Sequence, residues 1–294
     1  MKQAISRRQM MLSSVALPAF AQSKRPNVLF IAVDDLRPEL GCYGAKTILT
    51  PNIDRIAKQG MTFLRAYCQQ AVCSPSRTSL LTGARPDTTK VWDLVTHFRD
   101  AMPDAVTLPQ HFKDHGYFVQ GIGKIFHPGY DDPRSWSTPW QTPNAPTYAR
   151  PRSAELLDED ARRKSKDGPA FESAAVADDF YKDGKVAALA VETLRSLAQG
   201  PSPFFLAVGF AKPHLPFVAP KKYWDMYDPA EIKLAPNPYR PKGAPEYALT
   251  TSGELRNYHG QPAEGPIPDA LARQLKHGYY AAASYTDAQI GKLL

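Results

Sequence analysis

The chain has 294 residues, 43% hydrophobic and 22% charged, which allows one large domain or two ordinary ones and gives no sign of disorder. Its formal net charge of +7 is compatible with a polyanionic partner or with an ordinary solvated surface, and no basic run interleaved with aromatics supports nucleic-acid binding. The 3 cysteines can form at most one pair and have no C-x-x-C spacing, which excludes a disulfide framework.

Residues 1–21 have the order of an export signal. Basic residues come first, an apolar stretch runs from Met10 to Phe20, and Ala19-Phe20-Ala21 offers small residues for cleavage. Ser6-Arg7-Arg8 resembles a twin-arginine signal, an address for folded proteins. The apolar stretch is too short for stable membrane insertion. We therefore expect a periplasmic or secreted protein whose domain occupies residues 22–294; the alternative is a cytosolic amphipathic leader.

The first part of the domain begins with a predicted buried strand. The run NVLFIAVDD at 27–35 is apolar, rich in Val and Ile, and ends in two carboxylates. Such a run is typical of a buried parallel strand, and open α/β sheets bind their ligands at the carboxyl ends of these strands. Thr50-Pro51 opens a helix that Gly60 ends. The stretch GMTFLRAY at 60–67 predicts a short strand that leads to a loop around Cys73.

The second part alternates helices with strands. The patterns predict helices at 107–115, 178–199 and from Asp269 onward, strands at 117–123 and 203–210, and an irregular proline-rich, then charged segment at 128–170. In the second helix, apolar residues share one face: Val186, Leu189, Ala190, Leu194 and Leu197. This alternation predicts a doubly wound α/β sheet.

The paired acids Asp34 and Asp35 are the first candidate site residues. At the end of a strand the chain turns, so two consecutive carboxylates can converge on a hard divalent cation. A loop cap or plain surface charge is the alternative, and the residues alone do not decide between them.

Cys73 is the second candidate. Pro75 and the polar residues 76–79 predict a turn that enters a helix N-terminus, where backbone N–H groups favour an anion. Arg77 follows one helical turn later and could anchor that anion or the group at position 73. A buried inert thiol is the equally weighted alternative.

The stretch CSPSRTSLLTG at 73–83 resembles the signature of the sulfatase family, C-x-P-S-R-x-x-x-L-T-G, without a mismatch. Four further stretches resemble the iduronate-2-sulfatase branch of this family: DDLRPELGCYG (34–44), TPNIDRIAKQGMTF (50–63), GKIFHPG (123–129) and KPHLPF (212–217). The resemblance covers residues 27–294. It implies an alkaline-phosphatase-like, three-layer α/β sandwich with a mostly parallel central sheet.

The resemblance also implies the chemistry of Cys73. In this family a maturation enzyme oxidises the signature cysteine to formylglycine, whose hydrate has two hydroxyls. One attacks sulfur, and loss of the proton of the other expels sulfate and regenerates the aldehyde. The resemblance thus implies hydrolysis of a sulfate ester on a sulfated carbohydrate, such as a uronate of an acidic polysaccharide.

The remaining roles are carried over onto matching residues only. Asp34, Asp35 and the oxygen at position 73 would bind Ca²⁺, which polarises the sulfate. Arg77 would hold the hydrate and Lys124 would neutralise charge on the sulfate oxygens. His127 would assist proton removal from the second hydroxyl, and His214 would protonate the leaving oxygen. Outside the family, the lysine and histidines would be ordinary loop residues.

The family also has a further pair of metal ligands and a lysine on a later strand, which this sequence lacks. The segment SYTDAQIGKLL at the end resembles the helix before that strand, so we expect a domain apparently truncated at its C-terminus. Two alternatives remain: a phosphoester or phosphonate hydrolase of the same superfamily, which GKIFHPG and KPHLPF argue against, and an inactive glycan-binding fragment.

Overall fold

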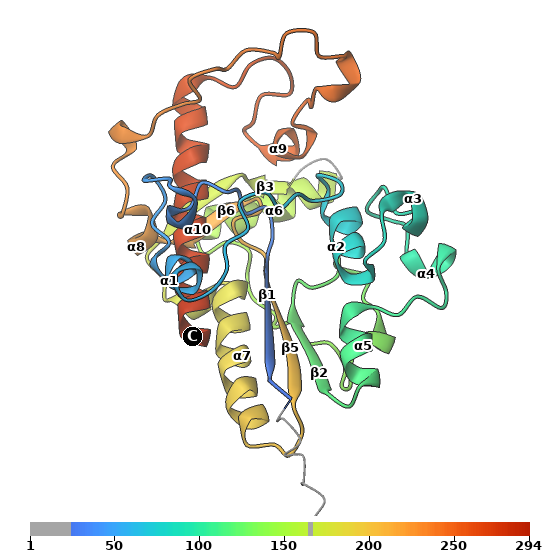
Figure 1. Ribbon diagram of the computed structural model, residues 1–294. Coiled ribbons are helices and arrows are strands. Elements are labelled where there is room, and N and C mark those ends of the chain that lie inside the picture. The colour runs from blue at the N-terminus through green and yellow to red at the C-terminus, as the bar shows by residue number, and fades with distance from the viewer. Residues whose placement is uncertain (1–24, 164–166) are drawn as a thin grey trace, which may run out of the picture.

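The computed structural model describes residues 25–163 and 167–294, so the expected leader at 1–21 lies outside the described residues (Figure 1). At its centre is a three-stranded parallel sheet in the order β1-β5-β2. These strands are β1 (Val28–Val33), β5 (Phe204–Phe210) and β2 (Phe118–Gly123). The strands predicted at 27–35, 117–123 and 203–210 are therefore confirmed.

Helices cover both faces of this sheet. On one face lie α7 (Lys182–Ala198) and α10 (Asp269–Leu293), and on the other lie α2 (Cys73–Thr82) and α5 (Leu108–Asp114) (Figure 1). Because side chains alternate along a strand, Leu206 packs with Val186 of α7, whereas Phe205 packs with Leu81 of α2. The predicted three-layer α/β sandwich is confirmed.

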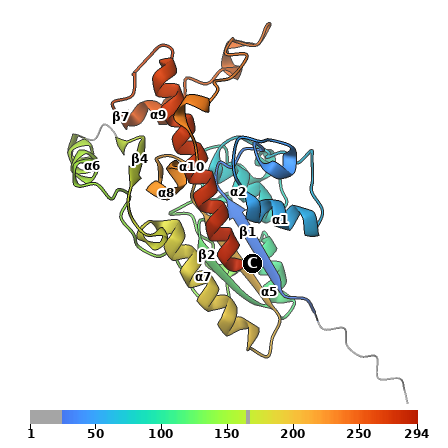
Figure 2. The ribbon, with the colours of Figure 1, turned by 90° about the vertical axis from the view of Figure 1, so that its left-hand side faces the viewer.

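The apolar face predicted for the helix at 178–199 also faces the core. In α7, Val186 and Ala190 are buried, and Leu189, Leu194 and Leu197 pack against the same cluster. The helix expected from Asp269 is α10, which crosses beside α7 in Figure 2. None of the helices in the described ranges is both long and apolar enough to cross a membrane.

The other elements are short or belong to excursions from the sheet. The helices are α1 (Pro51–Gln59), α3 (Pro86–Thr89), α4 (Phe98–Ala101), α6 (Pro151–Arg163), α8 (Lys221–Trp224) and α9 (Gly253–Asn257). Two small parallel sheets pair β3 (Asp167–Pro169) with β7 (Tyr258–His259), and β4 (Phe171–Ala174) with β6 (Phe217–Pro220).

Two local predictions were wrong. The stretch 60–67 forms no strand, because nothing in the described part of the chain pairs with it; Met61, Leu64 and Tyr67 are 80%, 76% and 79% exposed. The segment 128–170 is not irregular throughout, since it contains α6. Pro151 starts that helix at its first turn, where proline fits, and strong helix formers follow it.

Candidate functional site

The candidate residues meet at the carboxyl ends of the three central strands. Asp34 follows β1, Lys124 follows β2, and His214 lies on the loop after β5, while Cys73 is the first residue of α2 (Figure 1). A carboxylate oxygen of Asp34, the sulfur of Cys73 and a ring nitrogen of His214 lie within 4.8 Å of one another. Open α/β sheets bind ligands at this edge.

The sequence around Cys73 explains why a helix begins there. Val72 is extended with φ −141°, Pro75 occupies the first turn of α2, and Gly83 ends the helix with a left-handed φ of 69°. Cys73 is half-buried. Because it is the first residue of α2, its sulfur lies at a helix N-terminus, which favours negative charge. The predicted turn into a helix N-terminus is therefore confirmed.

Asp34 is the most strongly bound acid of the site. Its side chain is only 5% exposed and makes ion pairs with Arg77, where Nη2 lies 2.7 Å from Oδ1, and with Lys124. Burial alone would raise the pKa of Asp34, but the positive charges of Arg77 and Lys124 outweigh it and lower that pKa below its ordinary value. Arg77 also donates to the carbonyl of Ile125 at 2.9 Å. One network thus joins β1, α2 and the end of β2.

Two glycines allow the chain to pass close to itself here. The backbone N–H of Lys124 donates to the carbonyl of Gly209 at 2.9 Å. A Cβ at Gly209 would lie 2.0 Å from the carbonyl oxygen of Lys124, and Gly123 has a φ of +75°. Larger residues at either position would displace Lys124 from Asp34.

Asp35 joins the site from a strained backbone position. Its φ of 53° is left-handed, an uncommon conformation for a residue other than glycine. Its Oδ2 lies 3.8 Å from Nε2 of His214, and its side chain is 51% exposed. Asp34 and Asp35 therefore approach the same imidazole. Their oxygens suit a hard cation, but the sulfur of Cys73 does not, so the set fits such a cation once residue 73 carries oxygen.

His214 has an oxygen acceptor at each ring nitrogen. Nδ1 lies 2.6 Å from the carbonyl oxygen of Leu215, and Nε2 lies 3.3 Å from a carboxylate oxygen of Glu254. Because both contacts are satisfied only when both nitrogens carry protons, this geometry favours the imidazolium. Burial would lower the pKa of His214, but hydrogen bonding with Cys73 and the charge of Glu254 help to raise it above its ordinary value.

His127 is in the opposite electrostatic state. Burial, and then the positive charge of Lys124, lower its pKa below the ordinary value. Its Nδ1 is buried and has no hydrogen-bond partner among the described residues. Two histidines of one site therefore have pKa values that are shifted apart.

Three contributors were missed by sequence reasoning. Lys212 donates to the carbonyls of His214 and Pro216, both at 2.7 Å, and burial lowers the pKa of Lys212 to about 8. The buried Asp183 of α7 accepts from the backbone N–H of Lys212 at 2.7 Å. Lys212 stands in the KPHLPF stretch and could have been singled out. Glu254 and Asp183 have no sequence signal, because only the fold brings them to this edge.

Comparisons with known proteins agree with this geometry. The sulfatase family model matches residues 26–294. Human iduronate 2-sulfatase is 39% identical over 280 residues, which cover 91% of this chain and 50% of that protein. The chain thus spans about half the length of the curated relatives it matches.

Solved structures show the same fold at lower identity. The phosphonate monoester hydrolase of Agrobacterium radiobacter superposes with a TM-score of 0.63 at 22% identity, over 92% of this chain and 58% of that one. BT4656, solved with D-glucosamine-2-N,6-O-disulfate, has a TM-score of 0.62 at 20% identity, over 92% and 62%. The solved structures show the fold, and the family model over residues 26–294 together with the 39% identity to iduronate 2-sulfatase shows that the chain belongs to the sulfatase family.

Proposed function

We propose that residues 22–294 form the catalytic domain of an exported enzyme that hydrolyses a sulfate ester on a sugar of a sulfated polysaccharide. The observation that carries the proposal is geometric: a carboxylate oxygen of Asp34, the sulfur of Cys73 and a ring nitrogen of His214 lie within 4.8 Å of one another. The pKa values of two histidines support it, since that of His127 is lowered and that of His214 is raised. A pair of titratable groups with pKa values shifted apart provides a base and an acid at the same pH. Hydrolysis of an unactivated sugar sulfate needs both.

The group implied by the family at position 73 fits this arrangement. When present, formylglycine would supply a hydrated aldehyde as nucleophile, and Ca²⁺ held by Asp34, Asp35 and the oxygen at 73 would polarise the sulfate. The helix N-terminus at residue 73 supports the presence of negative charge there. A formylglycine-generating maturation enzyme is therefore a required partner in the proposal.

The chain's own side chains divide the remaining work. His214 would donate the proton on Nε2 to the oxygen that leaves with the sugar, and His127 would accept a proton at an unprotonated ring nitrogen. Lys124 has three N–H donors, so it can keep its ion pair with Asp34 and still donate to a sulfate oxygen. Arg77 keeps Asp34 ionised and the loop after β2 in place.

The sugar is proposed to be a uronate. Support comes from the 39% identity to a protein named iduronate 2-sulfatase and from the four sequence stretches shared with that branch. Without Lys2, Arg7 and Arg8 of the expected leader, the formal net charge is 7 − 3 = +4, and this mildly basic value is consistent with an acidic polymer.

The first experiment tests the nucleophile. The protein is produced with and without a maturation enzyme, and the tryptic peptide that contains residue 73 is analysed by mass spectrometry. We expect aldehyde only with the maturation enzyme. A peptide that stays entirely thiol under both conditions would remove this mechanism.

The second experiment tests the reaction and the acid. Sulfated uronate oligosaccharides, aryl sulfates and phosphonate monoesters are compared as substrates. We expect the His214→Ala variant to lose about 10²–10⁴-fold on sugar sulfates and far less on aryl sulfates, whose leaving groups need no proton. Preferential turnover of phosphonates would favour the rival hydrolase. Glycan binding without any turnover would favour a binding fragment.

A further inference from the structure

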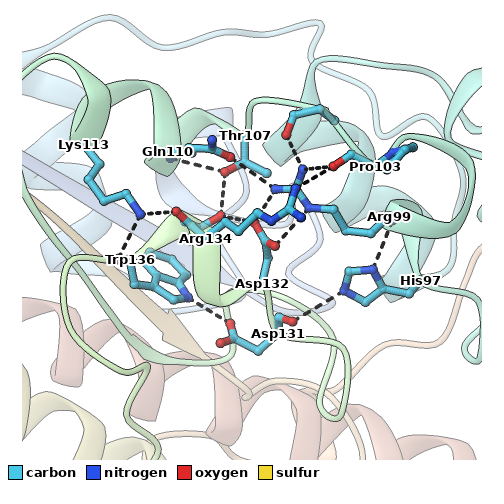
Figure 3. Close-up of polar contacts among 12 residues, drawn as sticks. His97, Arg99, Pro103, Thr107, Gln110, Lys113, Asp131, Asp132, Arg134 and Trp136 are labelled. Atoms are coloured by element: carbon cyan, nitrogen blue, oxygen red, sulfur yellow. Dashed lines mark hydrogen bonds and ion pairs between the residues drawn. The ribbon is translucent and has the colours of Figure 1, made fainter.

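We infer that Arg99 and Asp132 are positioning residues that hold His127 in place for catalysis. The inference rests on the base role proposed for His127, whose ring nitrogen Nδ1 has no hydrogen-bond partner among the described residues to hold it in place. It concerns the cluster drawn in Figure 3, which joins α4 to the loops around α5 and after β2.

His127 lies on a short turn between two fixed points of the chain. The backbone N–H of Tyr130 donates to the carbonyl of His127 at 2.9 Å, which closes the turn. The imidazole lies 6.2 Å from the ring of Tyr130, centroid to centroid, and its Nδ1 has no partner in the described part of the chain. The position of the imidazole therefore depends on where the backbone enters and leaves this turn.

The entry to the turn is fixed by packing. Ile125 and Phe126 are 1% and 5% exposed, and the ring of Phe126 stacks on that of Phe98 at 6.0 Å. Phe98 is the first residue of α4. One end of the turn is thus held by this short helix.

The exit from the turn is fixed by the next residue of the same helix. Arg99 and Asp132 form a two-pronged ion pair, with Nε to Oδ1 at 3.1 Å and Nη2 to Oδ2 at 2.8 Å. The Asp132 side chain is 3% exposed and that of Arg99 is 14% exposed. A two-pronged pair fixes orientation as well as distance, which a single contact does not.

The guanidinium of Arg99 makes further contacts that keep this pair rigid (Figure 3). It donates to the carbonyls of Pro103, at 3.0 Å, and Ala105, and to Oε1 of Gln110 at 3.2 Å. The hydroxyl of Ser135 donates to Oδ2 of Asp132 at 2.7 Å. With its donors occupied, Arg99 has little freedom to follow Asp132 if the loop shifts.

His97 supports the middle of the turn from the same side. Its Nε2 lies 3.5 Å from the carbonyl oxygen of Asp131, and its ring lies 6.3 Å from that of Tyr130. Residues 97–99 therefore contact the chain on both sides of His127: Phe98 contacts Phe126 before it, and His97 and Arg99 contact residues 130–132 after it. Loss of the Arg99–Asp132 pair should release the exit and let the imidazole move.

The matched test uses two neighbouring carboxylates of this loop. Asp132→Asn keeps the shape of the side chain but breaks the charged pair with Arg99. Asp131→Asn is the control, because Oδ1 of Asp131 accepts from the indole N–H of Trp136 at 3.0 Å, a neutral donor, and an amide oxygen can replace it. Arg99→Lys is a second, milder variant in case Asp132→Asn does not fold.

The first readout is independent of turnover. The protein with its 7 histidines labelled by ¹³C is examined by NMR, with His127 assigned from a His127→Gln variant and His259 and His277 as internal references. In Asp132→Asn and Arg99→Lys we expect the His127 signal to shift or broaden and the reference signals to stay. In Asp131→Asn we expect His127 to stay. An unmoved His127 signal in a folded Asp132→Asn or Arg99→Lys variant would overturn the inference.

The second readout applies to protein that hydrolyses a sulfate ester. Asp132→Asn should lower kcat about 10- to 100-fold with little change in KM, because displacement of a catalytic group affects the chemical step more than binding. Asp131→Asn should change neither. A shifted His127 signal without a loss of kcat would leave the positioning intact but remove the base role. The two failures are therefore distinguishable.

Discussion

The two edges of the central sheet differ in how they are covered. The outer edge of β2 is closed by residues 137–141: Ser137 donates its backbone N–H to the carbonyl of Val119 at 2.8 Å, and Gly123 donates to Gln141 at 2.8 Å. In the described residues β1 pairs only with β5, and a cleft of about 490 Å³ lies along its other side. Cys68 and residues 70–73, which help to line this cleft, come directly after the exposed apolar residues of 61–67 in the chain.

This difference divides the candidate site. Lys124 and His127 belong to the closed edge, where buried contacts fix the backbone on both sides of them. Asp35 and Cys73 line the cleft beside β1, and the side chain of Asp35 is 51% exposed. Asp34 links the two, since it follows β1 but pairs with Lys124. The backbone around Lys124 and His127 is therefore held on both sides, whereas the carboxylate of Asp35 lies half-exposed beside the cleft.

The largest contrast is expected at the two neighbouring acids. Asp34→Asn should lower the free energy of unfolding by about 3–5 kcal/mol, because Arg77 and Lys124 then remain buried without their counter-charge. Asp35→Asn should cost within about 0.5 kcal/mol, because that side chain is half-exposed. Urea unfolding followed by circular dichroism measures both. Equal losses would mean that Asp34 and Asp35 are not differently held.

Substitution of two leucines compares how much a buried and an exposed apolar side chain contribute to the free energy of unfolding. Leu206 of β5 is 0% exposed and Leu64 is 76% exposed. We expect Leu206→Ala to cost about 2–5 kcal/mol through lost burial and a cavity, and Leu64→Ala to cost less than about 0.5 kcal/mol. The same unfolding assay applies. A large loss at Leu64 would show that the 61–67 segment is covered in solution, for example by self-association, which sedimentation would detect.

The loss of folding stability at acidic pH should depend in part on Asp132. Burial alone would raise its pKa, but hydrogen bonds from Arg99 and Ser135 lower it below the ordinary value of 3.8. The unfolded chain then takes up the proton first as the pH falls. This stabilisation is present above the ordinary carboxyl pKa and is lost as the pH falls through the lowered one.

The neighbouring Asp131 provides a control of opposite sign. Burial raises its pKa, so protonation of Asp131 favours the folded state as the pH falls. Asp132→Asn should therefore flatten the fall in stability between about pH 5 and pH 2, and Asp131→Asn should steepen it. Thermal unfolding as a function of pH measures both slopes. Parallel curves for the two variants would contradict the assigned charge states.

The smallest effect is expected from calcium at the open side. If Asp34 and Asp35 hold Ca²⁺, binding at an excess of about tenfold over Kd adds about 1.4 kcal/mol to the free energy of unfolding, or about 2 °C in Tm. Asp35→Asn should reduce this shift, and Mg²⁺ should replace Ca²⁺ poorly because it demands stricter geometry. No shift with calcium in the aldehyde form would remove these residues as metal ligands.

Much of the framework was predictable from local sequence. The strands at 27–35, 117–123 and 203–210 were found because continuous apolar runs are typical of parallel strands covered on both faces. The residues named for the site, from Asp34 to His214, follow strand ends or begin a helix, and the structure brings them to one edge. The prediction of a strand at 60–67 was wrong because a strand also needs a neighbouring strand to pair with, and local propensity does not reveal whether one is present.

The sequence by itself determined the three central strands, the longest helices that cover them, the family and the residue types at the candidate site, because short-range periodicity and motif spacing are written in consecutive residues. Only the tertiary structure decided the charge states and supports of those residues. The pairing of Asp34 with Lys124, of His214 with Glu254 and of Arg99 with Asp132 joins positions 33 to 90 residues apart. Burial and Coulomb attraction act through space, so the shifted pKa values they produce emerge only after the chain has folded.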